Sequence, residues 1–281
     1  MLMSAWVALG RLRRRIGKPP LTHTVEVRHD WVRRHAPGRS FLDVGGMYAI
    51  KGEIAFLAEE AGASRVTALD AGDAPLVFEP ERRRRGSSVR YVQGDLEDPE
   101  AAARVGVHDV VFCTGVVYHS PNPVRQLLNL RAMCGDLLYF GTHAVPEVPG
   151  FPGACLYYPA FGEAERRALS KAYWRPEEHW GIGTPFNERA GLGYGNFWWG
   201  LTPSAVRAML HTAGFDVLEE RRVHETPFLL ELVARASDRP PLLPPVSYFR
   251  ERGERWEAGE VPFDWVDDSW REARDHGELP G

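Results

Sequence analysis

Residues 40–46 have the sequence SFLDVGG, and this stretch indicates the type of fold. They form a short apolar run that ends in two glycines, and residues 50–61 follow with the apolar spacing of a helix that stops at Gly62. A buried strand, a glycine turn and a helix make the first unit of an open α/β sheet, because the turn presents the free N–H groups of the helix at the end of the strand. We therefore expect a ligand to bind at this turn.

Strands and helices alternate along the chain after this unit. Apolar strands separated by helices are typical of a parallel sheet that is covered on both faces. Thr202 is a good N-cap and Pro203 fits the first position of a helix, and two strands joined by a short turn follow as an antiparallel hairpin. The predicted strands are 40–46, 65–70, 89–92, 109–114, 136–142, 215–223 and 228–236, and the predicted helices are 22–36, 50–61, 98–105, 124–133 and 203–213. We predict an α/β fold with a Rossmann-like, mostly parallel seven-stranded sheet, helices on both faces and a C-terminal antiparallel hairpin.

The composition excludes several classes of protein. With 281 residues, 44% hydrophobic and 11% aromatic, the chain can bury a large core, so it is not intrinsically disordered. Its three cysteines, Cys113, Cys134 and Cys155, are too few for a disulfide scaffold and lack the spacing of metal ligands. No apolar run reaches about 18 residues, so we expect no transmembrane helix. The apolar residues 1–9 precede the arginines at 11–15, which reverses the order of a secretory signal and predicts a cytoplasmic protein.

The chain divides into a main domain with an insertion and two extensions. We assign 1–38 to an N-terminal helical extension, 39–237 to the main domain and 238–281 to a tail rich in acidic residues, proline and tryptophan. Within the main domain, 146–200 form an insertion rich in aromatic residues, proline and glycine, which is typical of a lid over a binding site. Residues 1–40 carry nine basic side chains against two acidic ones, and 238–281 carry eleven acidic against six arginines. Ends of opposite charge favour contact with each other or with a second subunit, which suggests a homodimer.

Polar residues follow the predicted strands at their carboxyl ends. Asp70 closes the second strand, where a carboxylate can accept both hydroxyls of a ribose. Asp95 follows the third strand, where it can accept a hydrogen bond from an adenine amino group, and Thr114 and Gly115 end the fourth. Open α/β sheets bind ligands at this edge, so these residues predict a nucleoside site.

A nicotinamide dinucleotide is the alternative ligand. Its fingerprint, G-x-G-x-x-G, requires a second glycine for the close approach of a pyrophosphate. Met47 stands at that position in this chain. A ligand without a pyrophosphate fits the turn better, and the terminal hairpin also favours the methyltransferase topology over that of dehydrogenases.

The order of these motifs resembles that of class I S-adenosylmethionine-dependent methyltransferases. The resemblance covers roughly residues 40–236 and rests on the segments LDVGG, RVTALD, VQGDLED, DVVFCTGVVYHSPNP, GDLLYFGT and LTPSAVRAMLHTAGF. It implies that Asp43 and Gly45 hold the methionine portion of S-adenosylmethionine, Asp70 the ribose and Asp95 the adenine. The family's first motif is commonly D-x-G-x-G-x-G, and Met47 and Ala49 replace its later glycines here. The other predicted cofactor contacts are Gly46, Tyr48, Leu96, Thr114, Gly115 and Tyr118.

Methyl transfer requires positioning of the acceptor and, for a hydroxyl or ammonium nucleophile, removal of a proton. His119 follows the fourth strand, close to the expected methyl group, and is the first candidate for a base or a substrate contact; the alternative is a loop histidine that bonds the backbone. His143, after the fifth strand, is the second candidate. We expect aromatic residues of the insertion to line an apolar acceptor pocket, unless they form only a small core of their own. The substrate candidates are Tyr157, Tyr158, Trp174, His179, Trp198 and Trp199.

We therefore predict methyl transfer to O or N of a small, partly apolar metabolite, in natural-product biosynthesis, with S-adenosylmethionine as cofactor and no metal. The segment 115–121 is also similar to a motif of the wobble-uridine tRNA-modifying enzymes that use carboxy-S-adenosylmethionine, so an RNA-modifying methyl or carboxymethyl transferase is an alternative. Arginines at 11–15 and 82–85 could contact phosphates, but the net charge of −4 disfavours nucleic acid. A non-catalytic cofactor-binding protein of the same fold is a further alternative.

Overall fold

The computed structural model describes residues 24–47, 51–74, 76–166, 196–221 and 229–242. These residues belong to one compact unit, 1–242. The second unit, 243–281, makes up most of the predicted tail and lies outside the described residues. Tyr48, Trp174 and His179 also lie outside them.

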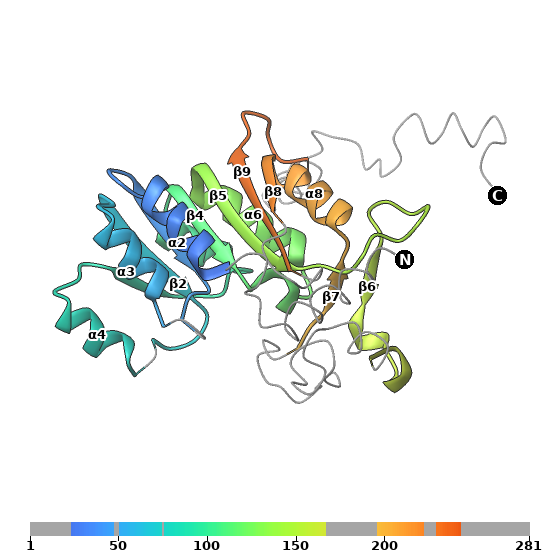
Figure 1. Ribbon diagram of the computed structural model, residues 1–281, viewed down its shortest axis with the longest axis horizontal. Coiled ribbons are helices and arrows are strands. Elements are labelled where there is room, and N and C mark those ends of the chain that lie inside the picture. The colour runs from blue at the N-terminus through green and yellow to red at the C-terminus, as the bar shows by residue number, and fades with distance from the viewer. Residues whose placement is uncertain (1–23, 48–50, 75, 167–195, 222–228, 243–281) are drawn as a thin grey trace, which may run out of the picture. The chain divides into compact units, whose positions relative to one another are not determined.

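The central feature is a seven-stranded sheet with the order β3-β2-β1-β4-β5-β9-β8 (Figure 1). Strands β1 to β5 are parallel, and β9 runs antiparallel to both β5 and β8. The predicted strands and the terminal hairpin are confirmed. The strands are β1 (Ser40–Val44), β2 (Arg65–Asp70), β3 (Arg90–Gln93), β4 (His108–Thr114), β5 (Cys134–His143), β8 (Phe215–Arg221) and β9 (Leu229–Ala236).

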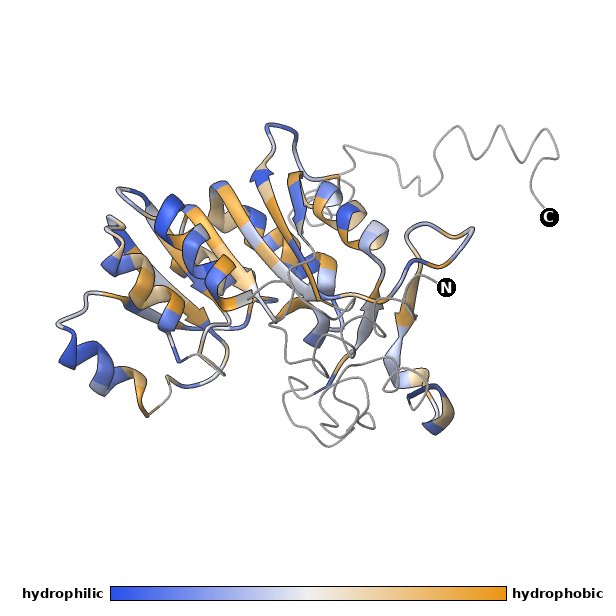
Figure 2. Ribbon diagram, in the orientation of Figure 1, coloured by the Kyte–Doolittle hydropathy of each residue, from blue (hydrophilic) through white to orange (hydrophobic). Residues whose placement is uncertain are grey.

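Helices cover both faces of the sheet because side chains alternate along each strand. Trp31, Phe41 and Tyr139 belong to one core with α2 and α3, whereas Leu42, Leu138 and Leu210 belong to a second core with α5, α6 and α8. In Figure 2 the middle of the sheet is orange and the outer turns of the helices are blue. The helices are α2 (Thr24–His35), α3 (Glu53–Glu60), α4 (Phe78–Arg84), α5 (Pro99–Val105), α6 (Pro123–Met133) and α8 (Pro203–Thr212), with short 3₁₀ turns η1 (Val117–His119) and η2 (Tyr158–Ala160).

The ends of the aromatic insertion form regular structure, which the sequence analysis did not anticipate. Strand β6 (Cys155–Tyr157) pairs antiparallel with β7 (Trp199–Leu201) in a separate two-stranded sheet. Directly after β7, Thr202 caps α8 by accepting a hydrogen bond from the N–H of Ala205, and Pro203 occupies the first turn, as predicted. The insertion therefore leaves and re-enters the domain through a paired stem.

Candidate active site

The turn after β1 is built for close approach to the backbone. Gly45 has φ +75°, and its N–H donates to the carbonyl of Leu69 at 2.9 Å. A Cβ on Gly45 would lie 2.2 Å from Cγ2 of Val116, and one on Gly46 would lie 2.2 Å from Oδ2 of Asp43. Neither position has room for a side chain, so the predicted glycine turn is required by the packing around it.

Asp43 is a buried carboxylate with an unsatisfied oxygen. Its side chain is 1% exposed, and Oδ2 has no hydrogen-bond partner among the described residues. Burial, followed by the negative charge of Asp70, raises the pKa of Asp43 to about 7, while the backbone of Ala55 in α3 acts in the opposite direction. A buried oxygen of this kind is satisfied by a hydrogen-bond donor or a cation, because leaving it unpaired is unfavourable.

Asp70 links the turn after β1 to the loop after β2. Its Oδ2 accepts from the N–H of Met47 at 3.0 Å, and its Oδ1 accepts from the N–H of Gly72 at 3.2 Å. The side chain of Met47 is buried in the core with Phe78. Met47 can therefore replace the second glycine of the dinucleotide fingerprint because its side chain packs into the core.

Asp95 lies at the same edge, after β3, and is exposed. Its Oδ1 accepts from the N–H of Glu97 at 2.8 Å, and the neighbouring Leu96 is buried. Glu97 in turn accepts from the hydroxyl of Ser120 and, at 2.8 Å, from the amide of Asn122. The loop that carries Asp95 is thereby bonded to the loop that follows β4.

Aromatic rings and imidazoles gather where β4 and β5 end. The ring of Tyr118 stacks on that of Phe197 at 4.6 Å and lies 4.2 Å from His119 and 4.7 Å from His143, between centroids. Gly115, which has φ +81°, donates to the carbonyl of Gly141 at 2.9 Å and so joins the two strand ends. The structure thus brings both predicted histidines and Tyr118 into one cluster, beside Thr114 and Gly115.

The two histidines differ in what they can do. The Nδ1 atom of His119 lies 2.8 Å from the carbonyl oxygen of Asn196. A carbonyl only accepts, so Nδ1 carries the proton in the neutral ring and Nε2 is the basic nitrogen. Burial lowers the pKa of His119, and burial followed by His119 lowers that of His143 to about 3. A ring with so low a pKa is a poor base near neutral pH, which favours His119.

The stem of the insertion is bonded to this cluster. The N–H of Trp198 donates to the carbonyl of Tyr118 at 3.0 Å, and Nε1 of Trp199 donates to the carbonyl of Pro121 at 3.0 Å. Tyr158 is buried and donates its N–H to the carbonyl of Trp198, whereas Tyr157 is 44% exposed and packs on Trp199 at 4.9 Å. Of the predicted substrate residues, Tyr158 therefore lies in the small core under the insertion.

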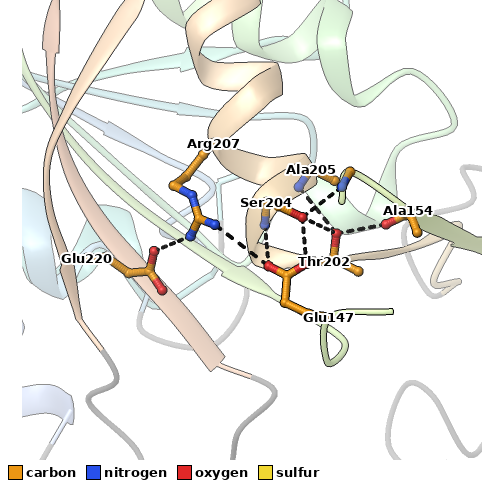
Figure 3. A network of polar contacts seen from close by, with 8 residues as sticks. Glu147, Ala154, Thr202, Ser204, Ala205, Arg207 and Glu220 are labelled. Carbon is orange, nitrogen blue, oxygen red and sulfur yellow. Dashed lines mark hydrogen bonds and ion pairs between the residues drawn. The ribbon is translucent and has the colours of Figure 1, made fainter. Parts of the chain in front are cut away.

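A polar network holds the other side of the stem (Figure 3). Glu147, which follows β5, accepts from the N–H and the hydroxyl of Ser204 at 2.7 and 2.6 Å. Arg207 bridges Glu147 and Glu220 at 3.7 and 2.6 Å, and the hydroxyl of Thr202 donates to the carbonyl of Ala154 at 2.9 Å. The network fixes the start of the insertion to the N-terminus of α8.

Sequence reasoning missed four residues of this region. Asn196 and Phe197 complete the histidine cluster, and Arg28 and Glu231 form an ion pair at the ends of the neighbouring strands. Glu231 leaves a signal, because it is the only charged residue in the apolar run LLELVA. The other three leave none, since their roles depend on contacts between distant segments.

The arginine run at 82–85 lies on α4 and its end. Arg82 pairs with Glu79, Arg84 with Glu81, and Arg85 with Glu60 while its guanidinium lies 5.0 Å over the ring of Phe56. Three arginines of this run are therefore paired with carboxylates of the same chain. Among the described residues no group of three or more His, Cys, Asp or Glu is arranged to hold a metal ion. None of the helices in the described part of the chain is long and apolar enough to cross a membrane.

These elements define the class I S-adenosylmethionine-dependent methyltransferase fold. A similar fold is found in the 1,6-didemethyltoxoflavin-N1-methyltransferase of Burkholderia thailandensis, a structure with S-adenosylhomocysteine bound, at a TM-score of 0.52 and 19% identity over 84% of this chain and 88% of that one. At that identity the match shows the fold alone.

Curated relatives match part of the chain. A ubiquinone biosynthesis O-methyltransferase of Vibrio parahaemolyticus is 33% identical over 108 residues, 37% of this chain and 44% of the relative. One from Azotobacter vinelandii is 36% identical over 128 residues, 44% of this chain and 53% of the relative. The chain thus spans about half the length of the curated relatives it matches. No protein-family model matches it.

Proposed function

We propose that this protein is an S-adenosylmethionine-dependent methyltransferase that acts on a small, partly apolar molecule. The observation that carries the proposal is the buried Asp43 carboxylate, whose Oδ2 has no partner among the described residues, beside a turn in which Gly45 and Gly46 have no room for side chains. An unsatisfied anionic oxygen fits the ammonium group of the cofactor's methionine portion.

The other residues of this edge fit the rest of the cofactor. The carboxylate of Asp70 ends β2 and is oriented by the N–H groups of Met47 and Gly72, which leaves acceptor capacity for ribose hydroxyls. Asp95 is exposed beyond β3, where it can accept from an adenine amino group. Gly46, Tyr48, Leu96, Thr114, Gly115 and Tyr118 remain proposed cofactor contacts.

His119 is the proposed base at the acceptor side. S-adenosylmethionine supplies an activated methyl group when bound, so the protein has to orient the acceptor and receive its proton. The carbonyl of Asn196 fixes the ring of His119 with Nε2 as the basic nitrogen. We assign proton removal from an acceptor hydroxyl to Nε2 and a packing role to His143. Oxygen is the preferred acceptor atom because the curated relatives are named O-methyltransferases.

Titration calorimetry with S-adenosylhomocysteine tests the cofactor assignment. The wild-type protein should bind, and Asp70→Ala should weaken binding by roughly 10-fold or more, because hydrogen bonds to a charged group are worth about 1.5–3 kcal/mol. Asp73→Ala, an exposed acid in the loop after β2, is the matched control and should bind normally. Absence of binding, or equal affinities for all three proteins, would contradict the assignment.

The alternatives predict different results in further assays. An RNA-modifying methyl or carboxymethyl transferase should bind tRNA with an affinity that falls steeply with salt, which a small-molecule enzyme should not do. A non-catalytic cofactor-binding protein should bind S-adenosylhomocysteine yet transfer no methyl group to any phenol or amine. Either result would replace the proposed reaction, and a carboxymethyl transferase would also replace the methyl donor with carboxy-S-adenosylmethionine.

We propose a cytoplasmic enzyme of small-molecule biosynthesis in which 39–237 form the methyltransferase domain, 146–200 its substrate insertion, and 1–38 and 238–281 extensions that support a homodimer. Removal of 238–281 should lower stability or change the oligomeric state measured by sedimentation. A truncated protein indistinguishable from the full chain would contradict the role of the tail.

A further inference from the structure

Arg28 is a charged residue on the inner side of α2. Its side chain is 23% exposed, and Trp31, one turn later on the same side, is buried. Nε of Arg28 donates to Oε1 of Glu231 at 2.8 Å, and Nη2 forms an ion pair with the same oxygen at 2.6 Å. Glu231 is fully buried in β9, and its Oε2 accepts from the hydroxyl of Tyr139. The guanidinium is therefore held in one orientation by a carboxylate that is itself fixed.

Burying the Arg28–Glu231 ion pair is an inefficient way to stabilise the fold. The free-energy cost of removing two charges from water can exceed the free energy gained from their mutual attraction. Apolar residues of similar volume often stabilise a core as well or better. The surroundings of Glu231 are suited to such residues, since Val233 and Tyr139 pack on the same side of the sheet. The position of the guanidinium suggests a functional rather than a stabilising role for the ion pair.

The guanidinium of Arg28 lies beside Gly141, near the proposed acceptor side of the site. Glu231 occupies the Nε–Nη2 edge, and Nη1 makes no hydrogen bond within the described part of the chain. A Cβ on Gly141 would lie 3.6 Å from Nη2 of Arg28 and 2.8 Å from Cγ2 of Thr114, so the guanidinium lies over the ends of β4 and β5. Its charge reaches Tyr118, where burial raises the pKa of the phenol and Arg28 opposes that rise.

We infer that Arg28 recognises a carboxylate on the methyl acceptor, which makes the substrate a hydroxy acid with an apolar, aromatic body. The N–H groups on the Nη1–Nη2 edge of a guanidinium can donate two parallel hydrogen bonds to one carboxylate. Glu231 offsets part of the positive charge, so selectivity comes mainly from the direction of these donors. The rings of Tyr118 and Phe197 provide an apolar surface beside them. The inference rests on the proposed function and specifies its substrate class.

The test compares acids with matched neutral analogues on protein saturated with S-adenosylhomocysteine. The probes are 3- and 4-hydroxybenzoate and the corresponding hydroxybenzamides, with binding measured by calorimetry and methyl transfer measured with S-adenosylmethionine. The wild-type protein should prefer an acid by roughly 10-fold or more, the range of a charge-assisted hydrogen bond. Arg28→Gln should raise the acceptor KM for the acid by the same factor, with little change in kcat or in the KM for the amide.

Two further variants separate recognition from stability. Arg28→Gln leaves the buried Glu231 without its partner, so the double variant Arg28→Gln/Glu231→Gln removes both charges and should fold while still lacking acid preference. Arg33→Gln, which changes an exposed arginine of α2, is the matched control and should keep the preference. Acid preference in the double variant, or none in the wild type, would overturn the inference. Loss of S-adenosylhomocysteine binding by the wild type would instead overturn the proposed function.

Discussion

The two halves of the carboxyl edge of the sheet are built in different ways. At the ends of β1, β2 and β3, the proposed cofactor half consists of a glycine turn and single carboxylates oriented by backbone N–H groups of the loops at the same edge. At the ends of β4 and β5, the proposed acceptor half consists of side chains from α2, η1, β5, β9 and the stem of the insertion. The first half depends on backbone geometry and the second on packing between distant segments. Substitutions in the two halves should therefore separate cofactor binding from turnover.

The largest expected effect is on turnover, from His119. Replacing His119 with Ala removes the proposed base, and general bases contribute about 10²–10⁴-fold to the rate. We expect kcat to fall by at least about 10²-fold, with the affinity for S-adenosylhomocysteine unchanged. In the wild type, burial lowers the pKa of His119 below 6.5, so kcat at saturating cofactor should be constant at neutral pH and fall only in more acidic solution as Nε2 becomes protonated.

His211→Asn is the control for the loss of an imidazole, because His211 is exposed on α8 and contacts Arg239. His143→Gln should have a smaller effect on kcat than His119→Ala. A full loss of activity in His143→Gln with an active His119→Ala would reverse the assignment of the base.

The next effect is on the cofactor half, from Gly45. Gly45→Ala meets two penalties: a left-handed backbone, worth about 1–2 kcal/mol for a non-glycine residue, and the contact with Val116. We expect a clear loss of unfolding free energy in denaturant titrations and a loss of S-adenosylhomocysteine affinity. Gly38→Ala is the matched control, since Gly38 has φ +72° but nothing within 4 Å of its added Cβ. Equal destabilisation by both variants would show that Val116 moves aside freely.

A smaller effect should come from replacing Asp43, and it should raise stability while weakening cofactor binding. Because the folded pKa is raised to about 7 from 3.8, the unfolded chain loses this proton first, and the free energy of unfolding falls between about pH 4 and 7. Asp43→Asn should therefore raise the melting temperature of the ligand-free protein at pH 8 and weaken S-adenosylhomocysteine binding by roughly 10-fold. In the wild type, affinity should decline as the pH falls through 7. A variant with unchanged affinity would remove Asp43 from the site.

The smallest effect should come from the stem of the insertion. Ser204→Ala removes the hydroxyl that bonds Glu147 near the N-terminus of α8, and the loss of such a polar contact at a helix start costs about 1 kcal/mol. We expect a modest fall in melting temperature and a few-fold rise in the acceptor KM, with cofactor affinity unchanged. An altered cofactor affinity would show that the two halves are coupled through α8.

The sequence predicted most of the fold because strands, helices and glycine turns are specified locally. Apolar runs of strand length, the amphipathic period of residues 50–61 and the Thr202-Pro203 start of α8 each depend on neighbours along the chain, and each was found near its predicted bounds. The insertion was harder to predict, since β6 and β7 are three residues each and stabilise one another across more than forty intervening residues.

The same division holds for the candidate site. The motif order pointed to Asp43, Gly45, Asp70 and Asp95, because each stands at or just after the end of a strand of a parallel sheet and must lie near its carboxyl edge. Tertiary structure decided that Met47 packs inward, that Asn196 sets the tautomer of His119, and that Arg28 and Glu231 meet above Gly141. The contact of Asn196 with His119 joins residues 77 positions apart in the chain, and that of Arg28 with Glu231 joins residues 203 positions apart. Periodicity and turn chemistry act over a few residues, whereas contacts across such separations exist only once the sheet has placed the segments side by side.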